Sequence, residues 1–171
     1  MAFSKSGLAL LAASDGTVYT YNNGAPGKSY KQTHAKMVSC INVVQDPTNP
    51  ANELVITGGA DKVIKLHLLA AGQMTELLVC TVPAVPRSVD FMEDQILAGL
   101  SNGTILELKN VMTNPSAPTM ETQIRSHYDG EAWGLALVDL PGRCLYFTCG
   151  DDNQILLYSG MAKTCIGEGR I

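Results

Sequence analysis

The sequence predicts an all-β protein made of about four similar four-stranded antiparallel units. Short apolar runs of strand length alternate with turns rich in Gly, Pro, Asn and Asp along the whole chain. A recurring hairpin centres on an acidic or amide residue, and these pivots are Asp15, Asp61, Asn102 and Asp152. Their separations of 46, 41 and 50 residues bracket the roughly 40–45-residue period of repeats that form propeller blades. We therefore expect residues 1–171 to form a single partial β-propeller.

Each unit also repeats a pattern around its pivot. A small residue comes shortly before the pivot, and a β-branched residue follows three positions after it, as Val18, Ile64, Ile105 and Ile155. β-Branched residues favour strands, so we expect this residue to lie in the second strand of each hairpin. Such regularity in four copies indicates a true repeat.

In chain order, residues 1–7 are expected to be the end of a strand and its turn. Apolar runs between turn signals predict further strands at 8–13, 17–21, 38–44, 54–57, 63–69, 77–82, 88–91, 95–99, 104–109, 123–125, 132–138, 144–147, 155–158 and 162–166. Asn102-Gly103 is expected to form a type I′ turn. Polar or Pro-containing stretches predict loops at 22–28, 46–52 and 110–122, and residues 167–171 are expected to begin a new blade.

The stretch HYDGEAWGL at 127–135, followed by FTCGDD at 147–152, carries a family resemblance. The chain resembles WD-repeat proteins and, within them, the echinoderm microtubule-associated-protein-like family. This resemblance implies a buried hydrogen-bond chain in each blade from an opening His, through a Thr, to the pivot Asp. The matching sets are His34, Thr57 and Asp61, and His127, Thr148 and Asp152. The Trp that often ends this chain is replaced by Tyr21, His67, Leu108 and Tyr158, so we expect looser blades.

The resemblance also implies a function. We expect a non-enzymatic protein–protein interaction scaffold in the cytoplasm, with a cytoskeletal or ciliary location and tubulin or microtubules as partners. A general WD-repeat scaffold, or a structural subunit of another multiprotein complex, is the alternative. The expected partner surface contains Tyr128, Asp129 and Arg87, because loops on a rigid scaffold carry recognition.

Composition and motifs argue against other functions. The formal net charge is −4 with only 12 basic residues, which disfavours nucleic-acid binding, and no run reaches the ~20 apolar residues of a membrane span. Asp129 and Glu131 lack a nucleophile partner, and Asp151-Asp152 has too few oxygen ligands for calcium. We expect no catalytic site, cofactor or metal, and we expect Trp133 to pack in the core.

Counting blades leads to a last expectation. A closed propeller has about 4–8 blades, and this chain supplies three whole blades and most of a fourth. Sheet faces and strand edges at the two ends would be uncovered. We therefore expect self-association through the open propeller edges, or blades supplied by another chain.

Overall fold

The computed structural model describes residues 1–125, 127, 132–140, 143–159 and 164–170. Within these residues the strands are β1 (Ala2–Phe3), β2 (Leu8–Ala12), β3 (Val18–Asn22), β4 (Ala25–Tyr30), β5 (Val38–Gln45), β6 (Glu53–Gly59), β7 (Val63–Ala70), β8 (Gln73–Thr81), β9 (Pro86–Met92), β10 (Gln95–Leu100), β11 (Thr104–Lys109), β12 (Thr119–Arg125), β13 (Ala132–Leu140), β14 (Arg143–Gly150), β15 (Gln154–Ser159) and β16 (Thr164–Arg170). They form four antiparallel four-stranded sheets in chain order: the first sheet (β1–β4), the second (β5–β8), the third (β9–β12) and the fourth (β13–β16). The predicted all-β class with four blades is confirmed.

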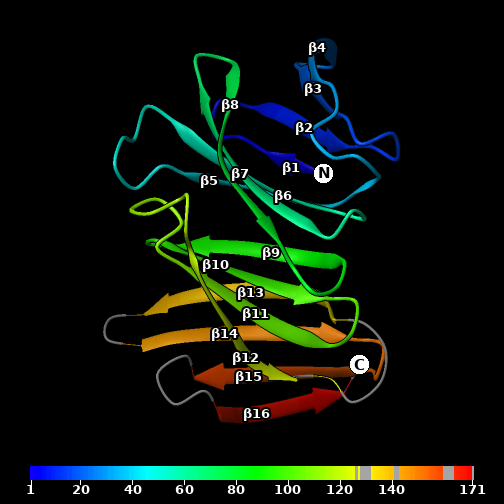
Figure 1. Cartoon of the computed structure of the whole chain (residues 1–171), viewed down its shortest axis with the longest axis vertical. Helices are drawn as coiled ribbons and strands as arrows, with labels where there is room; N and C mark the ends of the chain where they lie inside the picture. The colour runs from blue at the N-terminus through cyan, green and yellow to red at the C-terminus, as the bar shows by residue number, and fades with distance from the viewer. Residues whose placement is uncertain (126, 128–131, 141–142, 160–163, 171) are drawn as a thin grey trace.

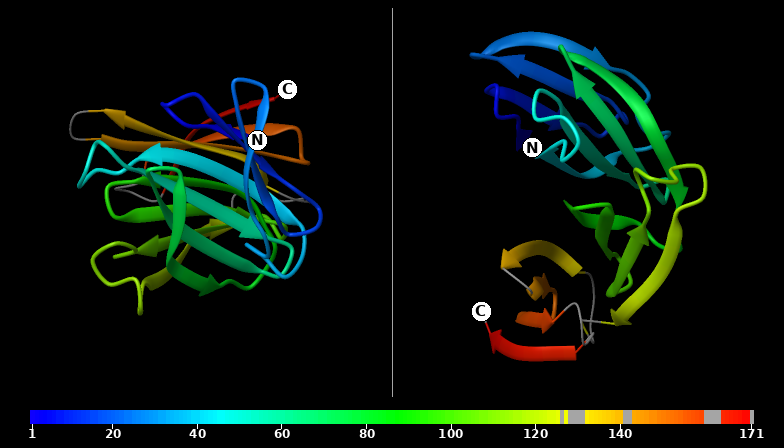
Figure 2. Two further views of the ribbon diagram at one scale, coloured as in Figure 1. Left: turned by 90° about the horizontal axis from the view of Figure 1, so that it is seen from above. Right: turned by 90° about the vertical axis from the view of Figure 1, so that its left-hand side faces the viewer.

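The four sheets follow one another along an open arc. Figure 1 shows them in chain order from the first sheet at the top to the fourth at the bottom, and the right view of Figure 2 shows the arc. The leading strands of consecutive sheets, β1, β5, β9 and β13, contact one another. These strands therefore line the inner side of the arc, as the innermost strands of propeller blades do.

Apolar side chains fill the space between consecutive sheets. Leu10 and Val18 of the first sheet pack with Val55 of the second. Ile56 and Ile64 of the second sheet face a large cluster that continues into the third, and the third sheet packs on the fourth through a further cluster. Since strand side chains alternate between faces, each middle sheet contributes apolar residues to both neighbours.

All four pivots form the same local structure. The side-chain oxygen of each pivot accepts a hydrogen bond from the backbone N–H two residues later, at 2.9, 3.3, 3.2 and 3.2 Å for Asp15, Asp61, Asn102 and Asp152. Asp and Asn make this Asx turn because their short side chains reach that N–H. This turn therefore explains why Asp or Asn recurs at the pivot of every sheet.

The predicted type I′ turn at Asn102-Gly103 is wrong. A type I′ turn needs positive φ at both central residues, but only Gly103 has it, with φ of 74°. The Gly103 N–H donates to the Leu100 carbonyl at 3.0 Å, so Ser101 and Asn102 are the central residues and Gly103 follows in the left-handed region. The other three hairpins place Gly16, Lys62 and Asn153 in the same conformation.

Three boundaries also differ from the prediction. The expected loop at 22–28 contains most of β4, whose residues are largely exposed, so neither its polarity nor Pro26 and Gly27 prevents an outer edge strand. The expected loop at 110–122 ends earlier, because β12 begins at Thr119. Residues 167–170 belong to β16 and pair with β15, so they extend the fourth sheet and do not begin a new blade.

Candidate functional site

The first buried polar set lies where the loop before β5 meets the second sheet. His34 Nδ1 is 3.1 Å from Asp61 Oδ1, and its Nε2 is 2.9 Å from the Thr57 hydroxyl. The Ala35 N–H also donates to the Asp61 carboxylate, at 2.9 Å. A ring N–H donated to the carboxylate leaves Nε2 to accept the Thr57 hydroxyl proton. The set therefore connects the incoming loop, the middle strand and the hairpin.

The second set repeats this geometry in the fourth sheet. His127 Nδ1 is 2.7 Å from Asp152 Oδ1, and Nε2 is 3.0 Å from the Thr148 hydroxyl. Both histidines are almost fully buried. The structure thus brings together each of the two sets expected from the sequence. Such contacts are typical of a structural network, because both ring nitrogens of each histidine are used within the chain.

Burial lowers the pKa of His34 below its ordinary value, although the neighbouring Asp61 carboxylate raises it. For Asp61, burial raises the pKa, but the Ala35 N–H and His34 together bring it below the usual range. A neutral imidazole beside an ionised carboxylate follows at neutral pH. In that protonation state, His34 Nε2 can accept the hydrogen bond from the Thr57 hydroxyl.

A break in strand register recurs near the start of the innermost strands β5, β9 and β13. In β5, Val38 pairs with Gly59 and Cys40 with Gly58, so Ser39 is one extra residue. The same step in register leaves Arg87 extra in β9 and Trp133 extra in β13. These are β-bulges, which re-aim a side chain away from the regular face of the sheet.

The bulges contact one another along the inner rim of the arc. The Ser39 hydroxyl lies 2.6 Å from the Pro86 carbonyl, and the Arg87 guanidinium lies over the Trp133 ring at 5.0 Å from its centroid. The Trp133 indole N–H donates to the Asp151 carboxylate. We call Ser39, Arg87, Trp133 and Asp151 the rim cluster. The cluster joins the second, third and fourth sheets. Its bulge residues Ser39, Arg87 and Trp133 lie outside the regular alternation of side chains along their strands.

The expectation that Trp133 packs in the core is wrong. The residue is 51% exposed, because the bulge turns it out of the apolar face on which Ala132 is buried. Arg87, expected from the sequence at the partner surface, contacts Trp133 directly. The other two residues expected there, Tyr128 and Asp129, lie outside the described residues, as does Glu131. Sequence reasoning missed Ser39 and Asp151.

The rim cluster has a rigid support beneath it. Asp90 on β9 accepts a hydrogen bond from the Asn42 side chain of β5 at 2.8 Å. Its second oxygen accepts the Leu137 N–H of β13 at 2.9 Å. One carboxylate therefore bridges the innermost strands of three consecutive sheets and fixes the relative positions of their bulges.

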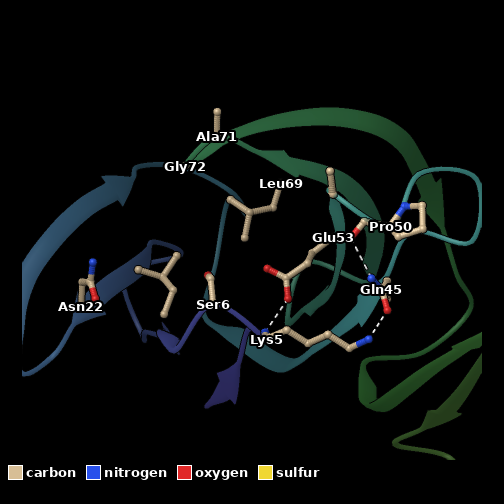
Figure 3. Close-up of a pocket in the computed structure, with 11 residues that line it drawn as sticks. Lys5, Ser6, Asn22, Gln45, Pro50, Glu53, Leu69, Ala71 and Gly72 are labelled. Carbon is tan, nitrogen blue, oxygen red and sulfur yellow. Dashed lines mark hydrogen bonds between the residues drawn. The ribbon is translucent and has the colours of Figure 1, made fainter.

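A separate hollow of about 560 Å³ lies between the first and second sheets (Figure 3). The Lys5 backbone N–H donates to the Glu53 carboxylate at 2.6 Å, and the Lys5 ammonium contacts the Gln45 side-chain carbonyl. Because these polar groups already bond to one another and hold the first sheet to the second, we take the rim cluster, and not this hollow, as the candidate interaction site.

Within the described ranges, His, Cys, Asp and Glu side chains form no group of three that could hold a metal ion. Those same ranges contain no helix long and apolar enough to cross a membrane.

The sequence of this chain is similar to that of a known repeat protein. The ciliary WD repeat-containing protein ctxp80 of Euplotoides octocarinatus is 39% identical to this chain over 104 residues, which are 61% of this chain. Over these residues the chain is similar to a WD-repeat protein. It matches only 13% of the length of that relative. The chain matches no protein-family model.

The fold also has a structural counterpart. The crystal structure of the computationally designed Ika4 protein matches with a TM-score of 0.63 at 18% identity, covering 92% of this chain and 88% of that one. This likeness shows the fold alone. It agrees with four successive four-stranded sheets.

Proposed function

We propose that this WD-repeat chain is a non-enzymatic scaffold that binds a protein partner of the microtubule cytoskeleton through the rim cluster. The observation that carries the proposal is the exposed Trp133, whose indole N–H donates to Asp151 and whose ring lies under the Arg87 guanidinium. Trp and Arg dominate the binding energy of protein interfaces, because they combine large contact area with directional polar groups.

The preorganised geometry supports this role further. A cation–π contact at an exposed site contributes about 0.5–1 kcal/mol, so Arg87 and Trp133 hold each other in place before a partner arrives. Side chains that are already ordered lose less conformational entropy on binding. The bulges rest on strands bridged by Asp90, and this rigid base presents the cluster at a fixed geometry.

The cytoskeletal part of the proposal comes from the relative. That protein is named as ciliary, and cilia are built on microtubules, so tubulin in polymerised form is the first partner to test. The proposed location is the cytoplasm, in a cilium or on the cytoskeleton. The matched segment is 13% of the length of that relative.

The experiment is co-sedimentation of the purified chain with polymerised tubulin, comparing wild type with Trp133→Ala and Arg87→Ala. Val79→Ala is the matched control, because Val79 is also 51% exposed but lies on the outer strand β8. We expect the Trp133 variant to lose about tenfold or more in affinity, as for an interface hot spot. A folded chain that does not sediment with microtubules overturns the cytoskeletal assignment. Sedimentation unaffected by both variants overturns the rim cluster as the site.

A further inference from the structure

The sequence contains two Asn-Gly pairs, and the structure places them in different surroundings. Asn23-Gly24 connects β3 to β4, and Asn102-Gly103 lies in the hairpin between β10 and β11. An asparagine followed by glycine is prone to lose its side-chain amide, because glycine has no Cβ to keep its backbone nitrogen away from the asparagine side chain. The two pairs are chemically alike, so a difference in their reactivity comes from the fold.

The first pair is open to water. Asn23 and Gly24 are the two central residues of their turn, because the residues on either side of them pair with each other. Their φ values of 48° and 79° define a type I′ turn. Both residues are exposed, and a Cβ added to Gly24 would meet nothing within 4 Å. In the part of the chain that the structure describes, the Gly24 N–H has no acceptor and the Asn23 side chain makes no hydrogen bond.

This exposure does not depend on what precedes the first sheet. Ala71-Gly72 is the equivalent turn of the second sheet, and its φ values of 49° and 69° give the same type I′ geometry. The first sheet packs against the second, yet Ala71 and Gly72 are both exposed. A turn at this position is therefore open to water even when another sheet lies before it.

The second pair is held by hydrogen bonds. Gly103 is buried, and its N–H donates to the Leu100 carbonyl at 3.0 Å. The Asn102 side-chain oxygen accepts the Thr104 N–H at 3.2 Å. The nitrogen that would attack and the carbonyl that it would attack are thus both engaged within the chain. These bonds must open before a reaction between them can begin.

We propose that Asn23 is a site of spontaneous deamidation in the folded protein and that Asn102 is protected from it. The Gly24 backbone nitrogen attacks Asn23 Cγ and closes a succinimide ring. The bond from Cγ to the side-chain nitrogen breaks, and ammonia leaves with the proton from Gly24. Water then opens the ring at either carbonyl and gives aspartate or isoaspartate, so a neutral amide becomes a carboxylate. The modification is independent of the scaffold's partner.

The isoaspartate product changes the hairpin that carries β4. It continues the backbone through the former side chain and adds one carbon to the two-residue turn, which then no longer has type I′ geometry. β4 has no buried face to fix its register, because its residues are exposed except for the half-buried Tyr30 at its end. The turn therefore sets the pairing of β4 with β3, and isoaspartate loosens that pairing.

The experiment is incubation of the purified full chain at mildly alkaline pH in water enriched in heavy oxygen, followed by digestion and peptide mass spectrometry. The label that enters on ring opening identifies conversion during the incubation. We expect Asn23 to convert at least about tenfold faster than Asn102, because two hydrogen bonds protect the second pair. Asn23→Ala should keep the fold, since Ala71 occupies the equivalent turn position. It should lack the acidic species that wild type gains on isoelectric focusing.

Unfolding the chain in guanidinium chloride provides the matched control. Without the fold the two pairs lose their different surroundings, so their rates should become similar. Similar rates in the folded chain overturn the proposal, as does faster conversion at Asn102. Asn23 that stays intact in the folded chain, while both pairs convert in denaturant, also overturns it. In the isoaspartate form, backbone amides of β4 should exchange hydrogen faster than in wild type, and unchanged exchange overturns the loosening of β4.

Discussion

A buried histidine should make this protein sensitive to acid. His67 on β7 is 4% exposed, and its Nδ1 atom has no hydrogen-bond partner within the described part of the chain. Burial lowers the pKa of His67 from 6.5 to about 4, although Glu76 on β8 opposes the shift; Lys65 and His34 act in the same direction as burial. The perturbation we choose is His67→Leu, because Leu108 occupies the equivalent position of the third sheet, fully buried.

The sign and size of the effect follow from proton linkage. The unfolded chain binds a proton at His67 below pH 6.5, whereas the folded chain resists it until about pH 4. The stability that depends on neutral His67 is therefore complete above pH 6.5 and is lost as the pH falls toward 4. A difference of about 2.5 pKa units corresponds to roughly 3 kcal/mol of unfolding free energy.

Urea unfolding followed by circular dichroism, at a fixed protein concentration and several pH values from 7 to 4, measures this difference. We expect the His67→Leu protein to gain roughly 3 kcal/mol relative to wild type across that range. His34, whose pKa is also lowered, is present in both proteins, so its burial contributes to both profiles. The control Val79→Leu should give a profile parallel to that of wild type. A gap between His67→Leu and wild type that does not change with pH would show that protonation of His67 does not destabilise the fold.

Three further predictions concern stability, each measured by urea unfolding at neutral pH. Thr148→Val should cost ~1–3 kcal/mol, since it leaves His127 Nε2 buried without its partner, and a smaller change than Thr20→Val would contradict this. Asp90→Ala should cost more than Asp90→Asn, because only the alanine removes both inter-sheet hydrogen bonds; equal costs would argue against the bridge. Gly58→Ala should cost ~1–3 kcal/mol and exceed Gly134→Ala. At Gly58 an added Cβ meets both Cys40 Sγ and Pro86 Cβ at 2.6 Å, whereas at Gly134 it meets only the Cys149 side chain.

The sequence predicted the hairpins well because their signal is local. The pivot residue, its Asx turn and the β-branched residue three positions later lie within one short segment, so the pattern can be read without knowing what the strand pairs with. β4 gave no such signal. As an exposed edge strand it needs no apolar face, and its residues look like a loop until the hydrogen bonds to β3 are known.

The exposure of Trp133 could not be predicted in the same way. A bulge shifts one strand against its partner, and the shift is visible only once both strands are aligned. Small residues beside it do give a signal: the pair next to each bulge is Cys40 and Gly58, Ser88 and Gly99, or Gly134 and Cys149. One member is always glycine, because a second Cβ would collide with its partner. Recognising these pairs would have placed the rim cluster.

The third sheet explains why the histidine sets occur where they do. It has no opening histidine, yet its pivot Asn102 makes the same Asx turn as the others, so the hairpin does not depend on histidine. What differs is the segment that enters the sheet. Seven residues separate β4 from β5 and six separate β12 from β13, but only four separate β8 from β9.

A short entering segment can be held by its backbone. Val82 N–H donates to the Lys62 carbonyl at 2.9 Å, and Ser101 N–H donates to the Val85 carbonyl at 2.8 Å, which ties both ends of the four-residue segment to neighbouring hairpins. The longer segment before β5 has more conformational entropy to lose. His34 anchors that segment to Asp61 and Thr57 by side-chain bonds. We infer that the histidine sets position long blade-to-blade connections, and that the pivot alone specifies each hairpin.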